Sequence, residues 1–397
     1  MSAPSTTTRV TTLGIDRLLD GDTDLIKRQR IGLVCNPASV DAGFRHSVDR
    51  LREADDFTLQ AVFGPQHGFR SDVQDNMIET PHARDARRAV PVYSLYSETR
   101  EPTDAMLRDI DVLVVDLQDV GTRVYTYVYT MANCMRAAAR HGVRVVVCDR
   151  PNPVGGDRVE GPLLQQPWTS FVGQFPIPLR HGMTIGELAR LFNDAFGIGC
   201  ALDVVPLDGW RRTMYYDETG LPWIIPSPNL PTLDSAIVYP GAVLFEGTML
   251  SEGRGTTRPF ELIGAPWIDG ERLADAMNGL GLPGVHFRPT YFQPTFQKHA
   301  QETCGGCQIH VLDRDRFEPV RAAVELIAAF RRQDPGRFAW RQPPYEYEHE
   351  KQPIDVLYGS DRLRNNVDAG GSVSELVESW KADRAAFLDQ RRPFLLY

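Results

Sequence analysis

Short apolar segments, each followed directly by polar residues, restrict the fold of this sequence more than any other feature. Four of them stand at residues 29–35, 58–63, 111–116 and 143–148, and segments with a helical pattern separate them. Strands that alternate with helices in this way predict a parallel sheet with helices on both faces. We therefore expect an α/β protein whose N-terminal domain is Rossmann-like.

Polar side chains follow the carboxyl end of each of these segments. They are Asn36, Gln66 with His67, the run 116–123, and the pair 149–150. In an open parallel sheet these ends lie at one edge, which is where such folds bind ligands. The sequence therefore predicts a pocket at this edge, although a single Gly-Pro loop of this kind also occurs as an ordinary solvated connection.

A proline-rich segment at 222–231 (P-W-I-I-P-S-P-N-L-P) predicts a rigid domain boundary. We accordingly divide the chain into residues 1–231 and 232–397. Before the boundary, Thr184 followed by Glu187 predicts a capped helix in which the glutamate is structural. After it, we expect a smaller α+β domain with strands at 238–245, 286–292 and 308–312 and a long helix at 317–333. This domain would complete the cleft.

Charge and hydropathy exclude several classes of partner. The net charge is -9 and no block of lysine or arginine stands out, so neither nucleic acid nor an anionic membrane surface is an expected partner. No apolar run reaches the length that spans a membrane. The N-terminus lacks the apolar core of a signal peptide, so we expect a cytoplasmic protein, of open oligomeric state.

No cofactor or metal is expected. The sequence contains no G-x-G-x-x-G after the first strand and no phosphate-binding G-x-x-x-x-G-K-[ST], which disfavours a nucleotide enzyme. Cys304 and Cys307 have C-x-x-C spacing, with His299 and His310 nearby, but a structural zinc site takes four ligands. We predict a glycine-rich turn with two reduced thiols.

Once nucleotide and metal sites are disfavoured, carboxylates among aromatic residues are the remaining candidates for catalysis. Asp119 lies in a glycine-bounded turn after a strand, and Glu246 and Glu252 lie in F-E-G-T-M-L-S-E-G-R-G-T. A pair of carboxyl groups cleaves glycosides, one protonating the leaving oxygen while the other attacks or activates water. The alternative is that these charges are structural and hold loop amides.

Several long motifs resemble the NamZ-type exo-β-N-acetylmuramidase family, over about residues 13–397. The resemblance implies a Rossmann-like N-terminal domain, a smaller C-terminal domain and a site in the cleft between them. It also implies cofactor-free release of terminal, non-reducing N-acetylmuramic acid from peptidoglycan fragments. The motifs are G-P-Q-H-G-F-R (64–70), D-L-Q-D-V-G-T-R-V-Y-T-Y (116–127), D-R-P-N-P (149–153), E-G-P (160–162), P-S-P-N-L-P-T (226–232) and Y-P-G-A-V-L-F-E-G-T (239–248).

One position departs from the family pattern. Many members carry G-P-E-H-G, in which the glutamate is the proposed catalytic acid, whereas this chain has Gln66. A glutamine amide hydrogen-bonds but cannot act as a general acid. Either another carboxylate takes over, with Asp72, Asp75, Glu79 and Glu246 as candidates, or the activity differs. The alternatives are a protein that binds muropeptides without cleaving them and a hydrolase of another glycoside.

We assign working roles on this basis. Gln66 and His67 would orient the sugar or a water, and Glu246 with Asp119 would be the acid and base. An arginine would pair with the lactyl carboxylate of the substrate, a small sugar or muropeptide. The substrate-binding candidates are Asn36, Arg70, Glu79, Arg123, Tyr125, Asn229, Glu252 and Arg254.

Overall fold

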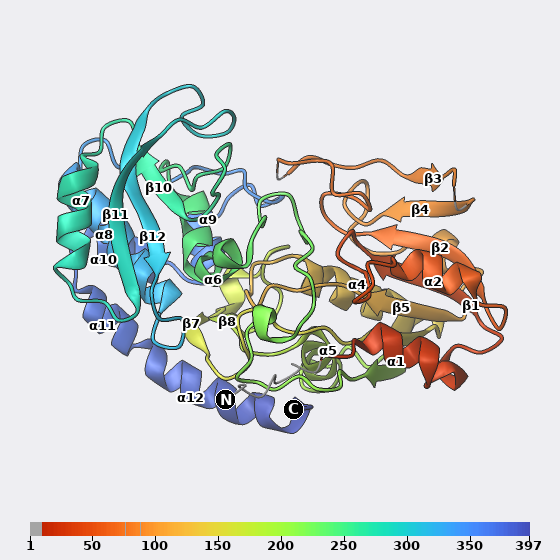
Figure 1. The fold of residues 1–397 in the computed structure, drawn as a ribbon. Coiled ribbons are helices and arrows are strands. Elements are labelled where there is room, and N and C mark those ends of the chain that lie inside the picture. Colours follow the sequence, from red (N-terminus) through yellow and green to blue (C-terminus); the bar gives the residue numbers. More distant parts are fainter. Residues whose placement is uncertain (1–9, 76, 88) are drawn as a thin grey trace, which may run out of the picture.

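A seven-stranded sheet forms the first part of the molecule (Figure 1). The computed structural model describes residues 10–75, 77–87 and 89–397. Apart from the antiparallel edge strand β3, neighbouring strands run parallel, which confirms the predicted α/β architecture. The order is β3 (Ala83–Asp85), β4 (Val90–Ser94), β2 (Thr58–Gly64), β1 (Arg30–Cys35), β5 (Val112–Asp116), β6 (Arg144–Cys148) and β9 (Leu202–Val205).

Helices cover both faces of this sheet because successive strand residues point to opposite sides. Val114 packs in one apolar cluster with α1 (Gly14–Asp20) and α2 (Ser47–Glu53). Its neighbour Val115 packs in the other cluster with α4 (Tyr127–His141) and α5 (Ile185–Asp194). The predicted capping box at the start of α5 is present.

The second part is smaller and mixed, as predicted. It begins with α6 (Leu233–Ala242) and η4 (Val243–Gly247) and continues into an antiparallel sheet in the order β10-β12-β11. The other elements of this part are β10 (Leu262–Ala265), α7 (Gly270–Asn278), β11 (Val285–Phe292), β12 (Cys304–Val311), α8 (Pro319–Gln333), α9 (Pro353–Tyr358), α10 (Arg362–Asp368), α11 (Val373–Glu378), α12 (Trp380–Arg391) and η5 (Arg392–Phe394).

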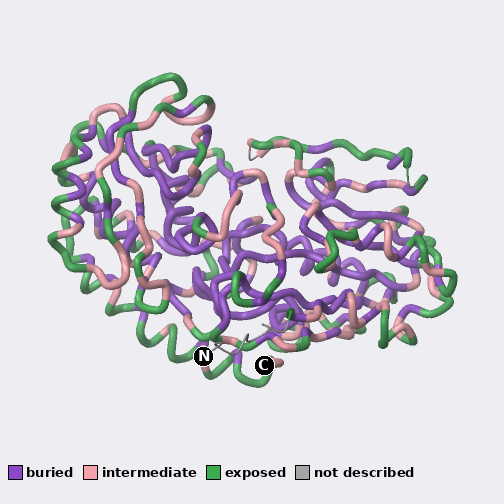
Figure 2. Tube along the Cα trace, viewed as in Figure 1, coloured by how far each residue is buried: buried purple, intermediate pink, exposed green. Residues whose placement is uncertain are grey.

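The two parts share one apolar core. A single cluster contains Val115 of the large sheet, Phe245 of η4 and Leu326 of α8, and Figure 2 shows buried chain in both parts and between them. Helix α12 runs back beneath the first part (Figure 1), so the hydroxyl of Tyr397 accepts a hydrogen bond from the backbone of Leu207 at 2.6 Å.

Short elements connect the larger ones in the first part of the chain. They are η1 (Thr23–Leu25), α3 (Asp104–Leu107), β7 (Glu160–Leu163), η2 (Gln166–Trp168), β8 (Pro178–Arg180) and η3 (Tyr216–Glu218).

Two local predictions were wrong. Residues 238–245 are helical, in α6 and η4, rather than a strand, because a short apolar run does not distinguish a buried strand from a buried helix. The Cys304-x-x-Cys307 segment is the start of β12 rather than a turn. Its glycines allow a close approach of backbone, since a Cβ on Gly306 would lie 2.0 Å from the carbonyl oxygen of Ile263.

The sequence predicts no metal site and no membrane-spanning segment, and the structure can be compared with these two predictions over the described residues. Within them, no cluster of three or more histidine, cysteine or acidic side chains has the arrangement of a metal site. No helix in the same ranges has the length and apolarity needed to cross a bilayer. Residues 1–9, on which the expectation of no signal peptide depends, lie outside the described residues.

Candidate active site

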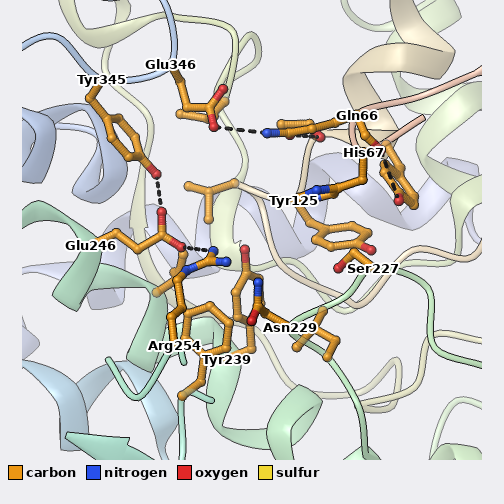
Figure 3. Close-up of a pocket in the computed structure, with 17 residues that line it drawn as sticks. Gln66, His67, Tyr125, Ser227, Asn229, Tyr239, Glu246, Arg254, Tyr345 and Glu346 are labelled. Atoms are coloured by element: carbon orange, nitrogen blue, oxygen red, sulfur yellow. Dashed lines mark hydrogen bonds and ion pairs between the residues drawn. The ribbon is translucent and has the colours of Figure 1, made fainter. Parts of the chain in front are cut away.

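A cavity lies where the two parts of the molecule meet (Figure 3). The loops after β2 and β5 form one side of it, and these strands flank β1 at the edge where open α/β sheets bind ligands. Residues from α6, η4 and the loop before α9 form the other side. The lining residues are Gln66, His67, Val124, Tyr125, Thr126, Tyr127, Val172, Ser227, Asn229, Leu230, Tyr239, Val243, Glu246, Arg254, Phe260, Tyr345 and Glu346.

Gln66 is held in one orientation by three side chains. Its Nε2 donates hydrogen bonds to Glu346 Oε1 at 3.0 Å and to the hydroxyl of Tyr96 at 3.2 Å. The hydroxyl of Thr126 donates to Gln66 Oε1 at 2.7 Å. With both ends of the amide bonded, Gln66 joins the sheet edge to the loop that carries Glu346.

Glu346 is a buried carboxyl group at the cavity wall. It is 4% exposed, and the hydroxyl of Tyr96 donates to its Oε2 at 2.7 Å. Burial raises the pKa of Glu346 above its ordinary value and the nearby charge of Glu246 adds to this, although hydrogen bonds from Tyr96 and Gln66 oppose it. The protonated acid is therefore favoured here more than in an exposed glutamate.

Glu246 is a buried carboxyl group in a very different environment. Arg254 Nη2 pairs with its Oε1 at 2.7 Å, and the hydroxyl of Tyr345 donates to its Oε2 at 2.7 Å. Burial alone would raise the pKa of Glu246, but Arg254, Tyr345 and Lys298 together hold it below its ordinary value. Glu246 is therefore ionised at neutral pH.

Glu252 lies behind this ion pair. Its Oε1 is 3.3 Å from Arg254 Nε, and Lys298 Nζ donates to its Oε2 at 2.8 Å. Two carboxylates and two cations thus alternate and balance in charge. Glu252 supports the cavity wall from outside the cavity, as a neighbour of Arg254.

His67 lines the cavity as a neutral ring. Its Nδ1 donates to the carbonyl of Val73 at 2.8 Å, which leaves Nε2 as an acceptor. Burial, assisted by the charge of Arg254, lowers the pKa of His67 to about 4. At neutral pH the ring can orient a hydroxyl or a water but does not supply a positive charge.

Asp119 lies outside the cavity. Its Oδ2 accepts from the backbone N–H of Gly121 at 2.8 Å and is 3.2 Å from His181 Nε2, both buried. These contacts fit the structural alternative, in which a turn carboxylate holds loop amides.

Arg123 is completely buried away from the cavity. Its Nη1 donates to the carbonyls of Pro162 and Ile177, both at 2.9 Å, and its Nη2 donates to that of Leu357 at 2.8 Å. The side chain therefore ties the β7–β8 region to the end of α9. Burial lowers the pKa of Arg123 to about 10.

The remaining candidates divide between the cavity and its surroundings. Asn36 Nδ2 donates to the carbonyl of Pro226 at 2.8 Å, next to the lining residue Ser227. Glu79 is exposed and pairs with Arg100 at 3.0 Å. The predicted residues that line the cavity are Gln66, His67, Tyr125, Asn229, Glu246 and Arg254, and those that do not are Asn36, Arg70, Asp72, Asp75, Glu79, Asp119, Arg123 and Glu252.

Sequence reasoning missed Glu346 and its neighbour Tyr345. Both lie in P-P-Y-E-Y-E-H-E (343–350), where acidic and aromatic residues alternate after two prolines. That alternation was the available signal. The contact that matters joins residues 66 and 346, which are 280 positions apart, so no local pattern indicates it.

Comparison with known proteins places this geometry in a family. The family model described as exo-β-N-acetylmuramidase NamZ, N-terminal, matches residues 31–234, and its C-terminal counterpart matches residues 237–397. The peptidoglycan β-N-acetylmuramidase NamZ of Bacillus subtilis (strain 168) is 46% identical over 384 residues, which cover 97% of this chain and 91% of that protein.

Two crystal structures of DUF1343 family proteins from Bacteroides fragilis NCTC 9343 share the fold. One has a TM-score of 0.89 at 36% identity, and the other has a TM-score of 0.74 at 30% identity. Each match covers 98% of this chain and 99% of the other. The chain belongs to the NamZ exo-β-N-acetylmuramidase family.

Proposed function

We propose that this protein hydrolyses the glycosidic bond of terminal, non-reducing N-acetylmuramic acid in peptidoglycan fragments. The observation that carries the proposal is the pair of buried carboxyl groups that line one cavity, Glu246 and Glu346. Their environments push the pKa values in opposite directions, which is the usual arrangement for dividing acid and base roles. The name of the Bacillus subtilis relative supports the choice of sugar.

The side chains that line the cavity suit a terminal sugar. Tyr125, Tyr239 and Phe260 supply aromatic wall for the apolar face of a sugar ring. Among the described residues that line it, Arg254 carries the one permanent positive charge, so we assign the lactyl carboxylate to Arg254.

The other roles are assigned to residues that line the cavity. Gln66 and His67 orient the sugar or a water, and Glu246 faces the reacting carbon as a carboxylate. We withdraw Asp119 as the partner base because its contacts are with Gly121 and His181 behind the cavity. The expected partner is a small sugar or a muropeptide. A cytoplasmic location is also part of this proposal, and cell fractionation tests it.

The test is release of the free sugar. Purified protein is incubated with a chromogenic β-N-acetylmuramide and with a disaccharide whose non-reducing sugar is N-acetylmuramic acid, and the products are separated by chromatography. We expect free N-acetylmuramic acid from both, and loss of release in Glu246→Gln. Asp72→Asn, an exposed carboxylate outside the cavity, is the matched control. Binding measured by calorimetry with no release from either substrate would contradict the proposal and favour a sugar-binding protein.

A further inference from the structure

Gln66 stands at the sheet edge of the cavity, yet its amide has no proton to give to a leaving group. The carboxyl group in direct contact with that amide is Glu346, whose Oε1 is 3.0 Å from Gln66 Nε2. In Figure 3 the two side chains lie next to each other, joined by this hydrogen bond. A carboxyl group that the loop after β2 does not provide is thus present beside Gln66, on the loop before α9.

We propose that Glu346 is the catalytic acid of this protein and protonates the glycosidic oxygen. The inference rests on the proposed function and names the proton donor within it. Gln66 then has a positioning role, because it fixes one oxygen of the Glu346 carboxyl group while Tyr96 fixes the other.

The local backbone presents Glu346 to the cavity. Tyr345 and Glu348 exchange two backbone hydrogen bonds of 2.9 Å, which closes a tight turn around residues 346 and 347. Glu346 has a φ of 44°, in the left-handed region that non-glycine residues rarely occupy, and such outliers cluster at functional sites. Tyr345, at the start of the same turn, bonds Glu246, so one turn serves both carboxyl groups.

The groups around Glu346 allow it to hold a proton. Burial disfavours its charged form, and the carboxylate of Glu246 disfavours it further, whereas Arg254 and the bonds from Tyr96 and Gln66 act in the opposite sense. The ring of Tyr347 packs edge-on against that of Tyr96, with centroids 5.7 Å apart, and the Arg100 guanidinium lies 3.7 Å from the Tyr347 ring centroid. The net effect is a raised pKa, as a general acid near neutral pH requires.

Water is the only reactant that the step needs besides the glycoside. The proton of the Glu346 carboxyl group moves to the glycosidic oxygen while the bond from that oxygen to C1 breaks, and the bonding electron pair stays on the oxygen. Water then adds to C1, leaving its hydroxyl group there, and its remaining proton restores the Glu346 acid. Glu246 stays ionised, where its charge stabilises the positive character that develops at C1.

The test compares two leaving groups in Glu346→Gln. A disaccharide has a poor leaving group and needs protonation, whereas an activated aryl glycoside does not. We expect kcat/KM for the disaccharide to fall by about 10²–10⁴-fold, the usual contribution of a general acid, and kcat/KM for the aryl glycoside to fall far less. The ratio of the two rates in one sample does not depend on the fraction of folded protein.

Glu350→Gln, an exposed residue of the same loop, is the matched control and should keep the wild-type ratio. Wild-type activity on the disaccharide should decline at high pH, and this limb should disappear in Glu346→Gln. Equal losses on both substrates, or no loss, would overturn the role of Glu346 and leave the proposed function intact. Failure of the wild-type protein to release the sugar from either substrate would instead refute the proposed function.

Discussion

Two arginines show how differently the same side chain is used at the residue scale. Arg123 and Arg254 are both buried, and of these two only Arg254 lines the cavity, although Arg123 lies within a motif of the family resemblance and Arg254 only follows one. Arg123 is surrounded by backbone carbonyls, whereas Arg254 lies between two carboxylates. Sequence identifies the charge but not the direction in which the side chain points.

Arg254→Lys tests the assignment of the lactyl carboxylate. Lysine keeps a positive charge beside Glu246 and Glu252 but lacks the planar fork that binds a carboxylate through two bonds. We expect kcat/KM to fall roughly tenfold or more for an aryl N-acetylmuramide and less for the matching N-acetylglucosaminide, which has no lactyl group. Arg258→Lys, partly exposed in the same segment, is the control. Equal losses on both substrates would contradict the assignment.

Arg123→Met tests the structural role. The change leaves three buried carbonyl groups without their partner, and each such group costs about 1–3 kcal/mol. We expect the free energy of unfolding, measured with urea, to fall by at least about 3 kcal/mol. The KM of the folded protein should stay unchanged. A raised KM without loss of stability would place Arg123 at the substrate after all.

Elements whose pattern is local could be predicted from the sequence. The parallel strands follow from their apolar runs and polar ends, and the cap of α5 follows from Thr184 and Glu187, which are three residues apart. Segment 238–245 could not be predicted in the same way, because its helical state depends on burial against α8. The position of Glu346 could not be predicted either, because its partners Gln66 and Tyr96 lie on loops of the first part, far away in the sequence.

Gly241→Ala tests how closely α6 must approach α8. A Cβ at Gly241 would lie 1.9 Å from the carbonyl oxygen of Pro319, so the helix must shift, and it carries Tyr239 and leads into Glu246. We expect a loss of about 1–3 kcal/mol in the free energy of unfolding together with a lower kcat/KM of the folded protein. Gly336→Ala, where the nearest atom is 3.6 Å away, should change neither. Unchanged kcat/KM in Gly241→Ala would show that the site tolerates movement of α6.

The whole molecule is joined by buried polar contacts as well as by the common core. Asp149, at the end of β6, accepts hydrogen bonds from Thr184 and Tyr397, both at 2.7 Å, and from the backbone of Gly186 at 2.8 Å. The C-terminus is thus fastened to the first part of the chain. The division at residues 231 and 232 stays a prediction.

Asp149 makes stability depend on pH. Burial, with the charge of Glu187, raises its pKa from 3.8 to about 7 in the folded protein. Between these two pKa values the folded state keeps a proton that the unfolded state has lost. The stabilisation that this proton gives the folded state is therefore complete below pH 4 and is lost as the pH rises through 7. The variant Asp149→Asn lacks this pH dependence because an amide does not titrate in this range. From pH 5 to 8 we expect wild type to lose roughly 2–3 kcal/mol relative to D149N in urea unfolding. Parallel pH curves for the two proteins would contradict this.

The direction of attack on a glycan chain tests the central claim most directly. Chains of alternating N-acetylglucosamine and N-acetylmuramic acid, with N-acetylmuramic acid at the non-reducing end, are incubated with the protein and followed by mass spectrometry. If the cavity binds one terminal sugar, as proposed, the products are free N-acetylmuramic acid and a chain shorter by that one residue. Internal fragments, or chains that remain intact, would contradict the account.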